Sequence, residues 1–225
     1  MPAAPAPRQL TLALGHAESF AREDFLRGAC NAAALALVDN WPDWPNRIMA
    51  ICGPPGAGKS HLAAIWGERS GARFLAGRSL TRDMPPAALA TGALVLEDLA
   101  PGRFEEPALF HLINLARQDG AYLLLTVREN PTRWPVGLPD LASRLRAIPV
   151  VTLAPPDDDL LAGVIAKLFA DRQIVADDAL IRYLMARVER AIPAVRAAVE
   201  RLDREAMQRK RPVNRALAAD LYRDE

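Results

Sequence analysis

Between residues 21 and 153, short runs of apolar residues alternate with longer stretches whose apolar positions recur every three to four residues. The runs are Ile48–Cys52, Arg73–Ala76, Ala93–Leu96, Tyr122–Val127 and Val150–Leu153. Runs of this length without alternation are typical of strands buried on both faces, and helical stretches between them favour parallel connections. The pattern therefore predicts an α/β fold, a parallel five-stranded sheet with helices on both faces.

From residue 155 onward the strand pattern gives way to helical spacing alone. The segments that have it are Asp157–Asp171, Asp177–Arg187, Ile192–Lys210 and Asn214–Arg223. Acidic residues open the first two segments, where the helix dipole stabilises them. The pair Pro155-Pro156 marks the change of pattern. We therefore expect a flexible arm over 1–20, an α/β base over 21–154 and a small all-helical lid over 155–225.

Composition excludes several classes of protein. The chain has 225 residues, 51% of them hydrophobic and 24% charged, as in ordinary globular proteins. Its formal charge of +1 provides no global basic field for sequence-blind capture of nucleic acid. Two cysteines, Cys30 and Cys52, are too few for a disulfide scaffold and fit a reducing compartment. Because the apolar runs are shorter than the ~18 residues of a membrane helix, we expect a cytoplasmic protein without a membrane partner.

A phosphate-binding loop (P-loop) follows the first predicted strand. Its G-x-x-x-x-G-K-[ST] pattern is Gly53, Pro54, Pro55, Gly56, Ala57, Gly58, Lys59 and Ser60, and His61 begins an amphipathic helix. Glycines let backbone N–H groups turn toward phosphate oxygens, Lys59 neutralises charge, and the Ser60 hydroxyl binds Mg²⁺. The sequence therefore predicts a site for ADP or ATP with Mg²⁺. A glycine-rich turn without a ligand is the alternative.

Two adjacent carboxylates, Glu97 and Asp98, come directly after the apolar run Ala93–Leu96. Such a pair is costly at the end of a buried strand unless a cation or hydrogen bonds compensate, so a catalytic pair is favoured over a capping role. Glu97 stands where a Mg²⁺ ligand is expected, and Asp98 stands where a residue would polarise the attacking water. Because the aspartate is the shorter of the two acids, we expect weak intrinsic ATPase activity at most.

Several segments resemble the replication-initiator branch of the AAA+ ATPases, which includes DnaA. Gly58–Leu62 carries the sequence Gly-Lys-Ser-His-Leu, Phe25–Asn31 resembles the segment that approaches the adenine, and Leu153–Asp157 resembles the junction to the lid. Arg196 stands at the position of the family's sensor-2 arginine. The resemblance covers about nine tenths of the chain and implies an AAA+ base followed by a helical lid.

The run Gly137–Leu145 is similar to the Hda branch of this family, which inactivates the initiator after replication begins. The resemblance implies that Arg144 is an arginine finger, supplied in trans to ATP on another subunit; a solvated helix arginine is the alternative. Two features depart from the pattern. Arg128 occupies about the sensor-1 position, where Thr126 is the other candidate, and Arg146-Ala147 replaces a usual Trp-Gly.

The arm contains Gln9-Leu10-Thr11-Leu12-Ala13-Leu14, which resembles the peptide by which Hda binds the β sliding clamp. In an extended strand the side chains of Leu10, Leu12 and Leu14 would lie on one side, and Gln9 would add an amide contact. The resemblance implies clamp binding through these four residues. An ordinary edge strand or a frayed start of the chain is the alternative.

Taken together, these resemblances imply a negative regulator of replication initiation that is tethered to the β sliding clamp of DNA polymerase III and stimulates ATP hydrolysis by DnaA. Contact with DNA would be indirect, through the clamp. Whether the chain forms a homodimer stays open. Two other functions stay open as well: a DnaC-like ATPase that loads helicase, and a non-catalytic adaptor for DnaA.

Overall fold

The computed structural model describes residues 20–223. Its strands are β1 (Ile48–Cys52), β2 (Arg73–Ala76), β3 (Ala93–Leu99), β4 (Tyr122–Val127) and β5 (Val150–Thr152). Its α-helices are α1 (Ala32–Asp39), α2 (Lys59–Ser70), α3 (Pro85–Ala88), α4 (Glu106–Gln118), α5 (Pro139–Arg146), α6 (Asp158–Ala170), α7 (Asp178–Met185), α8 (Ile192–Arg209) and α9 (Arg215–Leu221). Short 3-10 helices are η1 (Arg22–Asp24), η2 (Gly77–Ser79) and η3 (Pro131–Arg133).

The five strands form one parallel sheet in the order β2-β3-β4-β1-β5, which confirms the predicted α/β architecture. Strands β1, β2 and β4 have the predicted bounds, and β5 ends one residue early. Strand β3 is longer than predicted, because it continues through Glu97 and Asp98 to Leu99. Between Leu96 and Leu99 its register with β4 shifts, so that an extra residue is accommodated as a β-bulge.

Helices cover both faces of the sheet, and each face has its own apolar core. Helices α1 and α2 pack on one face, where Trp44 and Trp66 stack with ring centroids 5.0 Å apart. Helices α3, α4 and α5 pack on the other face. The strand residues alternate between these two cores, as period-2 geometry requires. This explains why the strands are apolar on both sides.

The helical segments predicted after residue 155 form a separate bundle of α6, α7, α8 and α9 around a third core. Three of these helices begin at a side chain that accepts a backbone N–H bond in the first turn, namely Asp157, Asp177 and Asn214. Such caps satisfy N–H groups that the helix itself leaves unpaired. The acidic residues foreseen at the start of α6 and α7 therefore fix where those helices begin.

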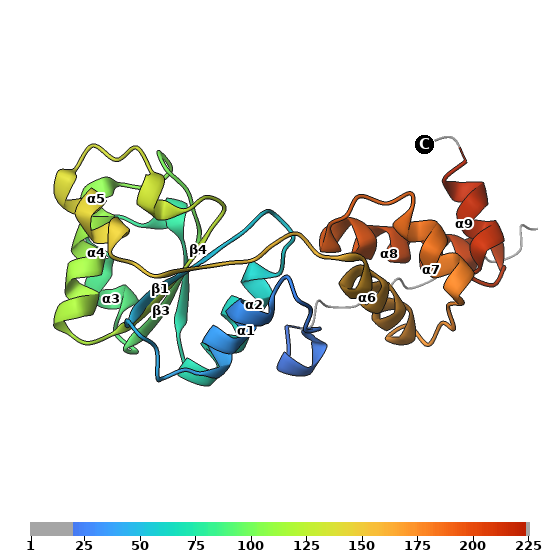
Figure 1. The fold of residues 1–225 in the computed structure, drawn as a ribbon, viewed down its shortest axis with the longest axis horizontal. Coiled ribbons are helices and arrows are strands. Elements are labelled where there is room, and N and C mark those ends of the chain that lie inside the picture. The colour runs from blue at the N-terminus through green and yellow to red at the C-terminus, as the bar shows by residue number, and fades with distance from the viewer. Residues whose placement is uncertain (1–19, 224–225) are drawn as a thin grey trace, which may run out of the picture.

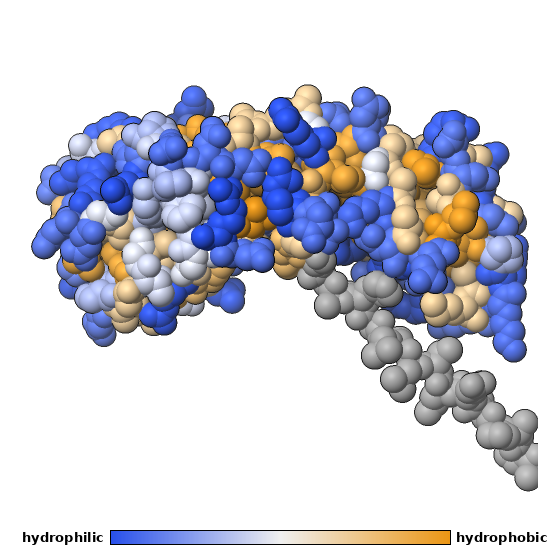
Figure 2. Space-filling view, turned by 90° about the horizontal axis from the view of Figure 1, so that it is seen from below, coloured by the Kyte–Doolittle hydropathy of each residue, from blue (hydrophilic) through white to orange (hydrophobic). Residues whose placement is uncertain are grey.

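Figure 1 shows the base and the lid side by side along the longest axis, joined by the chain that leaves β5. In the base, α1 and α2 lie nearer the lid, and α5 lies at the far end. Figure 2 shows hydrophobic residues at the surface near the middle of the long axis, where the two parts meet. A ligand bound at this junction would contact both parts.

Two further findings bear on the expectations from the sequence. Cys30 and Cys52 are both free thiols. Within residues 20–223, no helix combines the length and the apolar character that crossing a membrane requires. The proposed clamp-binding residues Gln9, Leu10, Leu12 and Leu14 lie outside the described part of the chain.

Candidate nucleotide site

The P-loop connects β1 to α2 at the carboxyl edge of the sheet. It consists of Gly53, Pro54, Pro55, Gly56, Ala57 and Gly58, and Lys59, Ser60 and His61 form the first turn of α2. Gly56 and Gly58 have φ angles of 73° and 96°, in the left-handed region that favours glycine. The first N–H groups of α2 have no partner within their own helix, which makes this end of the helix suited to an anion.

Backbone carbonyl groups of the loop hold the Lys59 side chain. Its Nζ donates hydrogen bonds to the carbonyl oxygens of Gly53 and Pro54, at 2.7 and 2.8 Å. Burial lowers the pKa of Lys59 below the ordinary lysine value, the positive charge of Arg128 lowers it further, and Asp98 opposes both effects. The ammonium group is thus incompletely compensated by the chain, so an anionic ligand would stabilise its charged form.

The P-loop also touches the lid. A Cβ atom at Gly56 would lie 2.5 Å from the Cδ atom of Pro193, the second residue of α8. Gly53 packs against Leu153 in the connection to the lid, where an added Cβ would lie 2.9 Å from the Leu153 Cβ. The loop is therefore closely covered by the residues that follow β5, and the absence of side chains at both glycines permits this approach.

A cavity of about 480 Å³ lies between the base and the lid. This volume is within the range of small-molecule sites. The predicted site residues that line it are Gly56, Ala57, Gly58, Lys59, Ser60, His61 and Arg196. Apolar side chains from both parts also line it, including Phe25 and Leu26 of the base and Leu160 and Val164 of α6. The cavity thus has a polar end at the P-loop and an apolar part that could hold a planar nucleobase.

The segment 20–31, which forms one wall of the cavity, is fixed by polar and aromatic contacts. Asn31 is almost completely buried; its Oδ1 accepts from the Gly28 N–H and its Nδ2 donates to the Leu26 carbonyl, both at 2.9 Å. The ring of His61 meets the ring of Phe25 edge-on, with centroids 5.1 Å apart. These contacts connect the wall to the first turn of α2.

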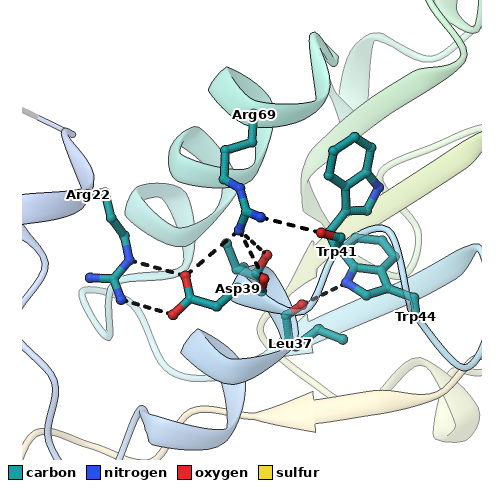
Figure 3. A network of polar contacts seen from close by, with 7 residues as sticks. Arg22, Leu37, Asp39, Trp41, Trp44 and Arg69 are labelled. Carbon is teal, nitrogen blue, oxygen red and sulfur yellow. Dashed lines mark hydrogen bonds and ion pairs between the residues drawn. The ribbon is translucent and has the colours of Figure 1, made fainter.

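A second network holds the same segment from outside the cavity (Figure 3). Arg22 forms a two-pronged contact with the carboxylate of Asp39 at the end of α1, with distances of 3.2 and 2.9 Å. Arg69 of α2 donates to the carbonyl oxygens of Val38, Asp39 and Trp41. Arg69 thereby binds carbonyl groups at the carboxyl end of α1 and just beyond it.

The lid contributes cations to the cavity. Lys167 of α6 lies 2.7 Å from Asp24 and 2.8 Å from Asp171, and these two carboxylates raise its pKa by hydrogen bonding. Since Asp24 belongs to η1, the Lys167–Asp24 pair ties the lid to the base. The sequence did not single out Lys167, because nothing in an isolated helix pattern indicates a partner in a distant segment.

The two carboxylates predicted at the end of β3 behave differently from one another. Glu97 is partly exposed, with Ala76 of β2 as its cross-strand neighbour. Asp98 is exposed and has a φ of 49°, and its N–H donates to the Thr126 hydroxyl at 2.9 Å. Its carboxylate receives two hydrogen bonds from Arg128, at 3.1 and 3.2 Å.

The partnership of Asp98 with Arg128 is a feature that the sequence did not reveal. Arg128 follows β4 directly, whereas Thr126 within β4 is 2% exposed with its hydroxyl already engaged by the Asp98 N–H. The positive charge of Arg128 lies close enough to Lys59 to lower the pKa of that ammonium group. Among the described residues, Glu97 and Asp98 do not line the cavity itself.

The residues present fit a Mg²⁺ ion of the kind that is bound largely through phosphates. Within residues 20–223, no group of three His, Cys, Asp or Glu side chains is placed to hold a metal ion. Mg²⁺ in phosphate sites commonly takes only one or two protein oxygens and keeps several waters. The exposed hydroxyl of Ser60 and the carboxylate of Glu97 are oxygen ligands of this type. When bound, the ion would neutralise part of the charge of the phosphates.

Arg144 lies away from this site. Helix α5 packs on the face of the sheet opposite α2, and only three residues separate its end from the start of β5. Its carboxyl end is therefore at the edge where the parallel strands begin, whereas the P-loop is at the edge where they end. The Arg144 side chain is partly exposed, and no other residue of the described chain forms a hydrogen bond or ion pair with it.

Comparison with solved structures reveals close similarity of fold. Domain III of the replication initiation protein DnaA from Thermotoga maritima matches with a TM-score of 0.74 and 19% identity, over 91% of this chain and 96% of that one. AMPPCP-bound DnaA from Aquifex aeolicus matches with a TM-score of 0.68 and 16% identity, over 84% and 69%. This chain has the DnaA-like AAA+ fold.

The same fold appears in a more distant match. The RuvB Holliday junction branch migration motor of Thermotoga maritima matches with a TM-score of 0.62 and 17% identity, over 76% of this chain and 59% of that one. No protein-family model matches the chain, and no curated protein sequence matches it. The DnaA-like AAA+ fold is thus established by structure, at low sequence identity.

Proposed function

We propose that the chain binds ADP or ATP with Mg²⁺ in the cavity between the base and the lid. The phosphates would lie on the P-loop against Lys59, and the adenine would lie among the apolar residues around Phe25 and Leu160. Ser60 and Glu97 would hold the metal ion, and Arg196 of α8 would contact the phosphates from the lid. Support comes from the cavity, the geometry of the loop and the AMPPCP that two matching DnaA structures contain.

We further propose that the nucleotide-bound protein is a negative regulator of replication initiation that supplies Arg144 in trans to ATP bound by DnaA. The observation that carries this proposal is the position of Arg144, partly exposed on the face opposite its own P-loop helix and without a partner in residues 20–223. An arginine in that position is available to another subunit. Its guanidinium would stabilise the charge that develops on the transferring phosphoryl group, an effect of ~10³–10⁵ in rate.

In this proposal the arm provides the tether. Gln9, Leu10, Leu12 and Leu14 would bind the β sliding clamp of DNA polymerase III, so that contact with DNA is indirect. A single short peptide of this kind would bind with moderate affinity, and two arms on one clamp ring would bind more tightly. DnaA would therefore be inactivated where clamps have been loaded.

The test is a reconstituted assay of ATP hydrolysis by DnaA, with this protein and with clamp loaded on DNA. We expect stimulation that needs both components. The variant Arg144→Ala should reduce it at least a hundredfold while leaving nucleotide affinity and clamp capture unchanged. Arg146→Ala, two residues further along the same helix, is the matched control and should stimulate like the unaltered protein.

Four results would contradict parts of this proposal. Full stimulation by Arg144→Ala would exclude the arginine finger. Undiminished clamp capture by a Gln9→Ala, Leu12→Ala double variant would exclude the tether. Vigorous ATP turnover by the purified protein alone would favour the DnaC-like helicase loader, and recruitment of DnaA that persists in Lys59→Ala would favour the adaptor.

A further inference from the structure

We propose that Arg128 restrains Asp98 and thereby slows the hydrolysis of ATP bound at the site. Both oxygens of the Asp98 carboxylate are engaged by the guanidinium of Arg128. The inference rests on the proposed nucleotide binding. It assigns a positioning role to an arginine that the sequence identified only as a departure from the family pattern.

The backbone fixes Asp98 in the orientation that this pairing needs. Strand β3 pairs with β4 at Leu96 and again at Leu99, and between these points Glu97 and Asp98 stand opposite Thr126 alone. A bulge of this kind re-aims the side chain that it carries, and the positive φ of Asp98 shows the local bend. The Thr126 hydroxyl then holds the Asp98 N–H. The side chain is thereby directed to the end of β4, where Arg128 follows.

Hydrolysis needs the carboxylate of Asp98 to be free. The oxygen of a water molecule bonds to the terminal phosphorus, the bond from that phosphorus to the bridging oxygen breaks, and ADP and inorganic phosphate are released. The water loses a proton in this step, and Asp98 would accept it. A carboxylate with both oxygens held by a guanidinium is not positioned to accept that proton.

The restraint is weak because both side chains of the pair are exposed to solvent. The side chains of Arg128 and Asp98 are 54% and 60% exposed, and exposed pairs favour the paired state by about fivefold at most. Arg128 also contributes positive charge beside Lys59, where it would attract phosphates. One residue therefore has two separable effects, since its charge favours binding and its planar two-pronged geometry holds Asp98.

The experiment measures two quantities on the full-length protein with Mg²⁺ and ATP: equilibrium affinity, and the rate of one round of hydrolysis with protein in excess. The variants are Arg128→Ala, Arg128→Lys, Asp98→Asn and the double variant Arg128→Ala, Asp98→Asn. Arg103→Ala is the matched control. Arg103 is an exposed arginine in the loop after β3, and its substitution removes the same charge as Arg128→Ala.

We expect Arg128→Ala to raise the rate about fivefold and to weaken ATP binding. Arg128→Lys should raise the rate similarly but keep the affinity, because lysine retains the charge and lacks the fork. In the Asp98→Asn background the rise should disappear. Arg103→Ala should change neither quantity.

A rate that is unchanged or lower in both Arg128 variants would overturn the restraint, as would a rise that persists in the Asp98→Asn background. Failure of the nucleotide proposal has a different signature: the folded, unaltered protein would not bind ATP. If Arg128→Ala fails to fold, Arg128→Lys decides the question, because it keeps the positive charge at the same position.

Discussion

Gly56 is a residue at which the P-loop closely approaches the lid. Its φ of 73° is unfavourable for residues with a Cβ, and an added Cβ would lie 2.5 Å from Pro193. We expect Gly56→Ala to reduce the free energy of unfolding by about 1–2 kcal/mol through its backbone and to push α8 away from the loop. Nucleotide affinity should fall as well. Equilibrium denaturation and nucleotide titration measure the two effects.

Gly102 separates these causes, because its φ is 71° and a Cβ added there would meet nothing within 4 Å. Gly102→Ala should therefore show the backbone cost without loss of nucleotide affinity. Equal nucleotide binding by the Gly56 and Gly102 variants would show that the contact with Pro193 has no part in the site.

The sequence predicted the P-loop because its glycines, Lys59 and Ser60 each have a local physical reason to be there. It did not predict the pairing of Asp98 with Arg128. That pairing depends on a bulge between two strands, and the bulge depends on register, which a single strand does not encode. The sequence did not predict the pairing of Lys167 with Asp24 either, because these residues meet only when the lid folds against the base.

Among the elements, α5 depends on one residue of its neighbour α4. Glu106, the first residue of α4, accepts hydrogen bonds from the N–H groups of Gly137 and Leu138, at 2.9 and 2.8 Å. These groups lie directly before α5, which carries Arg144. Glu106 therefore fixes where that helix begins.

We expect Glu106→Ala to lower the free energy of unfolding by about 1–2 kcal/mol, because two charge-assisted hydrogen bonds are lost. It should also weaken stimulation of DnaA without changing nucleotide affinity. Thermal denaturation and the reconstituted assay test this. The neighbouring Glu105→Ala removes only an exposed pair with Arg82 at 3.7 Å and should have little effect on either. Equal stability of the two variants would exclude the anchoring role.

The periodicity of apolar residues determined most helices and strands but not all of their ends. Strand positions followed from apolar runs, and the lid helices followed from helical spacing with acidic caps. The end of β3 was missed because Glu97 and Asp98 interrupt the apolar run although the strand continues. Strand pairing through the backbone does not depend on apolar side chains, so polar residues can extend a strand without a signal in hydropathy.

For the whole molecule, the base and the lid have separate apolar cores. The contacts that tie them include the Lys167–Asp24 pair and the approach of Pro193 to Gly56. We expect the lid to unfold before the base in the absence of nucleotide, and a ligand that contacts both parts to merge the two transitions. At a concentration of 100 times Kd, such a ligand adds about 2.7 kcal/mol.

Scanning calorimetry with and without Mg²⁺ and nucleotide measures this coupling. Lys59→Ala is the control, because its transitions should not respond to nucleotide. A single transition that nucleotide leaves unmoved would show that the cavity does not link the two parts.

Tryptophan fluorescence reports on only one of the two parts of this protein. All four, at positions 41, 44, 66 and 134, belong to the α/β part, and none occurs after residue 155. Since Trp44 stacks on Trp66 of the helix that follows the P-loop, their emission reports on the neighbourhood of α2 and is blind to the bundle. Fluorescence of an unlabelled sample would thus follow the α/β part alone, whereas far-ultraviolet dichroism would follow the helices of both parts, and a difference between the two signals would report on the bundle.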